Sequence, residues 1–76
     1  MKVVTPPGGG GEFPARLRAA RVKAGLSQSE LAAKSGVALG TVCRLEQGRS
    51  KEPKLSSVRP LAAALGVTIE ELMGGR

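Results

Sequence analysis

Glycine residues divide this chain into short segments that have the apolar spacing of an α-helix. Each of the first four helical segments is followed directly by a glycine: Gly25, Gly36, Gly48 and Gly66. Glycine is the residue found most often just past the end of a helix. Within the segments, apolar side chains recur every three or four positions, and no stretch alternates with a period of two over a useful length. The sequence therefore predicts an all-α fold of short helices without a β-sheet.

Five helices are expected, at about residues 14–24, 27–35, 37–47, 56–65 and 68–73. Two of them begin with a capping box, in which a serine or threonine hydroxyl accepts an N–H of the first turn and a glutamate reaches back. The two boxes are Ser27 with Glu30 and Thr68 with Glu71. They predict where the second and fifth helices begin.

Pro60 is the awkward residue of the fourth helix. Inside a helix a proline removes one hydrogen bond and clashes with the preceding turn. We therefore expect this helix to begin late, at about Ser56 or Ser57, or to be kinked at the proline. Pro14 raises no such conflict, because it suits the first turn of the first helix.

The chain of 76 residues is long enough for one small domain. Residues 1–12 are expected to form a flexible tail, because Pro6-Pro7 and the glycines at 8–11 cannot hold a helix. Residues 13–76 then form the folded domain. With one Phe and no Trp or Tyr, its core has to be built from Leu, Val, Ile and Ala.

The charge balance is basic. Twelve Lys and Arg against six Asp and Glu give a formal net charge of +6, which favours a polyanionic partner such as nucleic acid. The chain has no histidine, the commonest general base, and no nucleophile–base pair at a useful spacing, so an enzyme is not expected. With Cys43 as the only cysteine, neither a zinc site nor an internal disulfide is expected, and no cofactor or metal is implied.

No part of the sequence directs the chain to a membrane. No apolar run approaches the length of a membrane span. The N-terminus lacks the apolar region of a signal peptide. We therefore expect an intracellular protein without membrane contact.

Residues 28–47 have the pattern of a helix-turn-helix, in which two short helices cross steeply at a tight turn. The first helix needs a small residue where the second approaches it, and Ala32 stands there. The turn needs a residue that tolerates a positive φ, and Gly36 does so. Apolar residues must also hold both helices to the core, and four are suitably spaced: Leu31, Val37, Val42 and Leu45. The segment meets all three requirements.

These residues resemble the helix-turn-helix of the phage lambda-repressor and Cro class, also called the XRE family. The similarity extends from about Leu17 to Met73. It includes the runs Leu26-Ser27-Gln28, Glu30-Leu31-Ala32, Gly36-Val37, Thr41-Val42, Leu45-Glu46, Gly48, Pro53, Leu55, Leu61-Ala62, Leu65-Gly66-Val67 and Glu71-Leu72. The resemblance implies a five-helix fold whose third helix enters the major groove of DNA while the second lies across the backbone. It also implies a bacterial or phage-encoded protein that acts in the cytoplasm, at the nucleoid.

The third helix has an outer face that is expected to meet base edges. With Val42 and Leu45 turned inward, this outer face consists of Leu39, Gly40, Cys43, Arg44 and Gln47. Arg44 is the strongest candidate for a base contact, because a guanidinium can donate to both acceptors of a guanine. Its alternative role is to clamp a phosphate.

Three more residues complete the expected base-contacting set. Leu39 is placed to pack on a thymine methyl, and its alternative is that of an ordinary exposed apolar residue. Gly40 would allow close approach of the backbone to DNA, or it is merely a small filler. Thr41 has two alternatives, donation to a phosphate or a bond within its own turn.

A second set is expected to contact phosphates. Gln28 begins the second helix, whose free N–H groups and dipole attract phosphate. The resemblance implies that Gln28 contacts a phosphate and braces the third helix, with Ser27 and Ser29 beside it. The rest of the set surrounds the loop after the third helix: Gln47, Arg49, Ser50, Lys51 and Lys54. Its place beside the recognition helix favours phosphate contacts over a merely solvated loop.

Arg21 and Glu46 are expected to be structural. Each falls on an inward-leaning side of its helix. The resemblance implies that these positions form a buried ion pair, which would hold the first helix to the third. Removing one partner would leave an uncompensated buried charge.

The resemblance predicts a transcriptional regulator, a repressor in the first instance, that binds double-stranded DNA at an inverted-repeat operator. One recognition helix reads few bases, so a homodimer is expected. The fifth helix supplies either the dimer seam or the closure of the core, through Ile69, Leu72 and Met73. In the second case the dimer forms only on DNA.

Two further hypotheses stay open at the level of sequence. The same fold serves antitoxins and bridging proteins, whose helices contact another protein instead of DNA. Cys43 lies at the edge of the outer face, where oxidation would block docking, so a redox switch is a second hypothesis.

Overall fold

The computed structural model describes residues 12–49 and 53–74. Its helices are α1 (Glu12–Lys23), α2 (Gln28–Ser35), α3 (Leu39–Gln47), α4 (Leu55–Leu65) and α5 (Ile69–Met73). The described ranges contain no strand, so the predicted all-α, five-helix fold is confirmed. Within the same ranges, no helix has the length and apolar character needed to cross a membrane. Residues 1–11 of the predicted tail lie outside the description.

The predicted capping boxes are present at α2 and α5. The hydroxyl of Ser27 accepts the N–H of Glu30 at 3.0 Å, and the carboxylate of Glu30 accepts the N–H of Ser27 at 2.8 Å. Thr68 and Glu71 repeat this arrangement at 3.0 and 2.8 Å. Both helices therefore begin where the sequence predicts.

Two other helices begin at residues that differ from the prediction. α1 begins at Glu12, ahead of Pro14, which is tolerated because the N–H groups of a first turn have no acceptor within the helix. α3 begins at Leu39 instead of Val37. Val37 belongs to the turn, where its N–H donates to the hydroxyl of Ser35 at 3.1 Å.

α4 begins slightly earlier than predicted, and the alternative of a kink at Pro60 stays a prediction. The helix begins at Leu55 with Lys54 as its N-cap, and Pro60 lies inside it. The N–H groups of Ser57 and Val58 both donate to the carbonyl of Lys54 at 2.9 Å, which fixes the first turn ahead of the expected start. The missing N–H of Pro60 leaves the carbonyl of Ser56 without its helical donor. Ser56 is exposed, so water can take that place.

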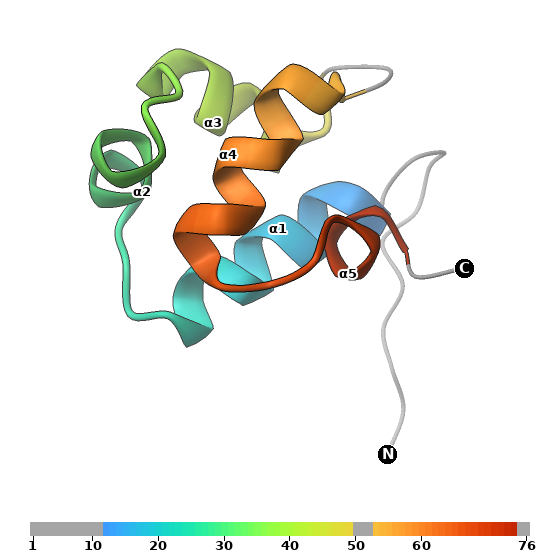
Figure 1. The fold of residues 1–76 in the computed structure, drawn as a ribbon. Helices are drawn as coiled ribbons and strands as arrows, with labels where there is room; N and C mark the ends of the chain where they lie inside the picture. Colours follow the sequence, from blue (N-terminus) through green and yellow to red (C-terminus); the bar gives the residue numbers. More distant parts are fainter. Residues whose placement is uncertain (1–11, 50–52, 75–76) are drawn as a thin grey trace.

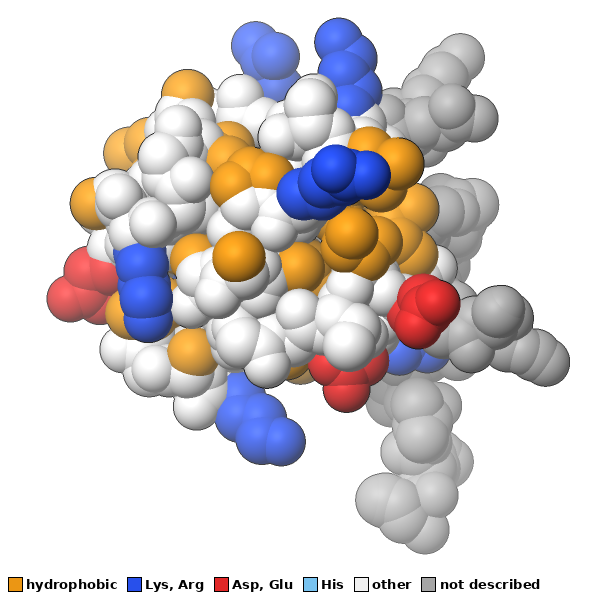
Figure 2. All heavy atoms as spheres, viewed as in Figure 1, with side chains coloured by type: hydrophobic (Ala, Val, Ile, Leu, Met, Phe, Trp, Pro, Cys, Tyr) orange, Lys and Arg blue, Asp and Glu red, His pale blue; other side chains and the backbone are white. Residues whose placement is uncertain are grey.

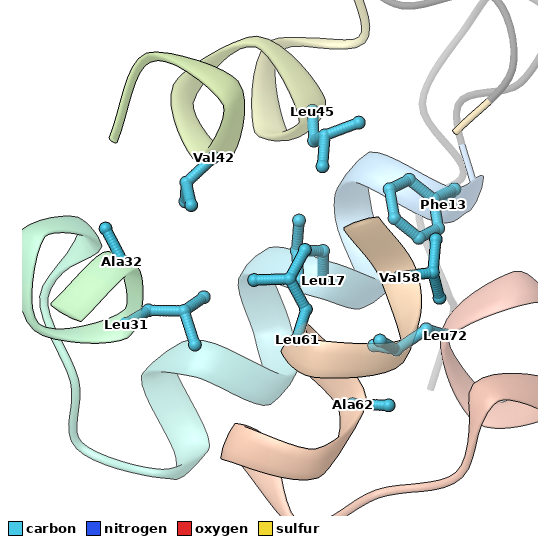
Figure 3. Packing of buried hydrophobic residues seen from close by; sticks show 10 residues of the cluster. All are labelled: Phe13, Leu17, Leu31, Ala32, Val42, Leu45, Val58, Leu61, Ala62 and Leu72. Carbon is cyan, nitrogen blue, oxygen red and sulfur yellow. The ribbon is translucent and has the colours of Figure 1, made fainter. Parts of the chain in front are cut away.

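The core collects buried apolar side chains from all five helices. Figure 3 shows Leu17 of α1 and Leu61 of α4 close together at its centre. The complete set is Phe13, Leu17, Leu31, Ala32, Val42, Leu45, Val58, Leu61, Ala62 and Leu72. Leucine, valine and alanine thus form almost the whole core, as the composition predicts, and Phe13 is its one aromatic member.

The helices are arranged so that α3 rests on two others. α3 packs against both α1 and α2, and α4 packs against α2 and α5. Figure 1 shows α2 and α3 together on one side of the domain and α5 on the other. In α5, Leu72 is buried in the core and Ile69 packs against it, whereas Met73 is exposed. α5 therefore closes the core through Leu72 and Ile69 and leaves Met73 at the surface.

A matched pair of valines tests this division between core and surface. Val58 is fully buried in α4, and Val22 is 61% exposed in α1. We expect Val58→Ala to lower the free energy of unfolding by about 2–3 kcal/mol, because it removes buried methyl groups and leaves a cavity. Val22→Ala is expected to change it by less than about 0.5 kcal/mol. Urea denaturation with an unchanged m value measures both. Equal losses in the two variants would contradict the assignment.

Candidate nucleic-acid interface

The segment from α2 to α3 forms the predicted helix-turn-helix. Gly36 ends α2 with φ of +80°, and its N–H donates to the carbonyl of Ala32 at 2.9 Å. This left-handed conformation is the one that favours glycine. On the far side of the turn, Val42 and Leu45 are buried and hold α3 to the core. The turn thus directs one face of α3 inward and leaves the other face outside.

The outer face of α3 is largely exposed, as predicted. Leu39 is 44% exposed, and Gly40, Arg44 and Gln47 are exposed as well. A Cβ built on Gly40 would meet no other atom within 4 Å, so internal packing does not require a glycine there. The structure therefore gives no internal reason for a glycine at this position, and its role stays a prediction.

Two residues of α3 lie differently from the rest of this group. Thr41 and Cys43 are half-buried at the margins of the outer face. Thr41 remains accessible from outside only in part. Cys43 faces α2, where its thiol donates to the side-chain carbonyl of Gln28 at 3.3 Å. The structure thus places Cys43 between the two helices of the motif.

The predicted phosphate-contacting residues divide into two groups around this face. Ser27, Gln28 and Ser29 stand at the N-terminus of α2, where Ser27 also caps the helix. Gln47, Arg49 and Lys54 are exposed on either side of the loop after α3. Ser50 and Lys51 lie outside the described residues. The N–H of Arg49 donates to the carbonyl of Arg44 at 3.1 Å, so Arg49 is fixed directly against the end of α3.

The predicted ion pair between Arg21 and Glu46 is present. Arg21 Nε donates to Glu46 Oε2 at 2.6 Å, and Arg21 Nη2 donates to Glu46 Oε1 at 3.1 Å. The side chain of Glu46 is only 4% exposed and that of Arg21 only 13%. Arg21 Nη1 also donates to the carbonyl of Leu26 at 2.8 Å. One guanidinium therefore ties α1 to α3 and to the segment that leads into α2.

The guanidinium of this pair keeps its charge. The hydrogen bond to Glu46 is the largest influence on it and raises the pKa of Arg21 above its ordinary value, against the opposing effect of burial. An arginine is protonated at any pH at which a protein is studied. Arg21 is thus a permanent positive charge on α1, and the carboxylate of Glu46 on α3 neutralises it.

The resemblance implies that Gln28 braces the third helix, but it does not name the partners of Gln28 on α3. Gln28 Nε2 donates to Glu46 Oε1 at 3.0 Å, while its Oε1 accepts from Cys43. Cys43 and Glu46 are three residues apart, so they lie on the same side of α3. That spacing was a usable signal, but only the register of α2 against α3 shows that Gln28 lies opposite them.

Comparison with known proteins agrees with this geometry. A family model described as helix-turn-helix matches residues 17–72, which is most of the chain and includes α2, the turn and α3. This chain belongs to the helix-turn-helix family. Its five-helix architecture is that of the lambda-repressor-like, or XRE, class of the family, as the sequence predicts.

Three relatives are similar to this helix-turn-helix domain. The HTH-type transcriptional repressor RghR of Bacillus subtilis is 38% identical over 61 residues, which cover 80% of this chain and 45% of that protein. The uncharacterized HTH-type transcriptional regulator RghRB of the same species is 36% identical over 61 residues, or 80% of this chain and 44% of its own length. An uncharacterized HTH-type transcriptional regulator of Coxiella burnetii is 37% identical over 49 residues, or 64% of this chain and 23% of its own. The chain thus spans less than half the length of these relatives.

Glu46 is the residue whose loss should most weaken the helix-turn-helix. We expect Glu46→Ala to lower the free energy of unfolding by about 3–5 kcal/mol, because it leaves the nearly buried Arg21 without its counter-charge. Glu70→Ala is the matched control. Glu70 is exposed in the first turn of α5, where its interaction with the helix dipole is worth less than about 1 kcal/mol. Thermal or urea unfolding of both variants checks this, and a loss in Glu46→Ala as small as in the control would refute a structural pair.

Proposed function

We propose that this helix-turn-helix domain binds double-stranded DNA with sequence preference and acts in transcriptional regulation, as a repressor. In this proposal α3 enters the major groove, where Arg44 contacts a base and Leu39, Gly40 and Thr41 lie against base edges. The N-terminus of α2 and the residues around the following loop contact phosphates. The action takes place at DNA in the cytoplasm of a bacterium.

The observation that carries the proposal is the position of the two charges on α3. The helix contains one acid, Glu46, and one base, Arg44. Glu46 is nearly buried and paired with Arg21, whereas Arg44 is exposed. The outer face of α3 therefore presents a single positive charge and no carboxylate, which suits contact with a polyanion.

The surroundings of α3 support the same partner. Arg49 follows the helix directly, and Lys54 caps α4 across the loop, both exposed. The N-terminus of α2 offers free N–H groups on the other side, next to Gln28. Basic side chains and helix N-termini are the groups that contact phosphates in protein–DNA interfaces, and both kinds occur next to α3.

The length of α3 favours a paired binding mode. A helix of nine residues is about 14 Å long, which spans roughly four base pairs. A homodimer on an inverted repeat would bring two such helices to half-sites about 10 base pairs apart. Because two of the three apolar residues of α5, Ile69 and Leu72, pack in or against the core, we propose that this dimer forms on DNA.

Arg44 provides the most specific test of DNA recognition. Selection from random duplex DNA first supplies a preferred site. On that site we expect Arg44→Ala to weaken binding about 5- to 150-fold, the equivalent of ~1–3 kcal/mol, because a base contact is lost. On unrelated duplexes the loss is expected to be smaller. Fluorescence anisotropy measures both.

Arg18→Ala is the matched control for that loss. Arg18 is an exposed arginine of α1, which packs behind α3, and Figure 2 shows that basic side chains occur at several separate places on the surface. The control removes the same charge away from the outer face and should leave the preference for the selected site intact. An equal loss of preference in both variants would contradict a base contact by Arg44.

Lys54 tests the phosphate contacts. It makes no side-chain cap bond, so Lys54→Ala should leave the fold intact. We expect the variant to bind all duplexes more weakly and the slope of log K against log salt to become shallower by about 0.9. Lys23→Ala, at the end of α1, should leave the slope unchanged. Binding of the wild-type chain that is independent of salt would instead favour the protein-interaction function of antitoxins and bridging proteins.

A further inference from the structure

We propose that Cys43 is a positioning residue for DNA binding: its thiol orients the side-chain amide of Gln28 so that one N–H stays directed to a backbone phosphate. This inference rests on the proposed DNA-binding function. It replaces the expectation that Cys43 belongs to the outer face, because the structure places its thiol against α2.

The amide of Gln28 is held at both ends by α3. Its oxygen accepts from Cys43 Sγ at 3.3 Å, and its nitrogen donates to Glu46 Oε1 at 3.0 Å. An amide is planar, so a bond at each end fixes its rotation about the last side-chain torsion. Gln28 is half-buried between the helices, which leaves part of its side chain accessible from outside.

The orientation of this amide follows from the charge of Glu46. A carboxylate that accepts from Arg21 at both oxygens offers only acceptors, so the NH₂ group of Gln28 has to face it. The carbonyl oxygen then faces Cys43, the residue that supplies the donor. Without a donor at position 43, this oxygen has no other partner among the described residues, and the amide is held at one end only.

The second N–H of the amide is the group left for a ligand. An NH₂ group has two hydrogens, of which Glu46 takes one, and the described residues provide no acceptor for the other. Gln28 is the first residue of α2, an eight-residue helix whose N-terminal N–H groups attract an anion to the same place. A phosphate oxygen is therefore the acceptor that this N–H fits. Cys43 keeps the N–H available without touching DNA.

A double-mutant cycle tests whether Cys43 acts through Gln28. On the selected duplex, we expect Cys43→Ala to weaken binding about two- to tenfold, the effect of one misplaced hydrogen bond. The same substitution in a Gln28→Ala background should have no further effect, because the group that it positions is gone. Cys43→Ser retains a donor and should lie close to the wild type. Equal losses from Cys43→Ala in both backgrounds, or no loss in either, would overturn the proposal.

An NMR measurement on the free protein separates this proposal from DNA binding itself. The two hydrogens of the Gln28 side-chain amide should have well-separated shifts in the wild type and in Cys43→Ser. In Cys43→Ala the separation between the two shifts should shrink toward that of a free glutamine side chain, because the amide gains mobility. Unchanged shifts in Cys43→Ala would overturn the positioning role even if DNA is bound. Failure of the wild type to bind any duplex would overturn the proposed function while leaving this result to stand.

Discussion

The ion pair of Arg21 and Glu46 is the interaction on which the helix-turn-helix depends. It joins α1 to α3 through two hydrogen bonds, and a third bond from Arg21 reaches the carbonyl of Leu26 just before α2. Glu46 then accepts from Gln28, so α2 is connected to the same carboxylate. A buried pair of this kind need not add stability over an apolar core. What distinguishes this pair is its connectivity, because its hydrogen bonds join α1, α2 and α3.

The same pair determines the charge that α3 presents. With Glu46 turned inward and neutralised, Arg44 is the only charge on the outer face. Gly36 makes this possible, since its left-handed turn sets α3 at an angle that buries Val42 and exposes the opposite side. Packing, charge and turn geometry therefore point one short helix outward. With only one strong base contact to offer, such a helix would depend on dimer spacing and DNA shape for much of its selectivity.

Much of this structure could be predicted from sequence because its signals are local. Capping boxes and terminal glycines lie within one turn of the helix ends that they define, and the core residues follow from helical spacing. The start of α4 could not be found this way. A proline is preferred in the first turn of a helix, whereas this helix begins at Leu55, with Lys54 as its N-cap, and contains Pro60 in its interior. The bracing of α3 by Gln28 followed from the family resemblance, but its partners Cys43 and Glu46 could not be named, for another reason. They depend on the register between two helices, which periodicity within each helix does not contain.

A recognition role for α3 is tested by mapping backbone amide shifts of the ¹⁵N-labelled chain by NMR as a selected duplex is added. We expect the largest changes on α3, the first turn of α2, Arg49 and Lys54. A shallow hollow of about 550 Å³ between α1 and the α4–α5 turn, lined by Lys23 and Val67 among others, should remain unaffected. Changes centred on that hollow, or spread evenly over all basic residues, would contradict a recognition role for α3.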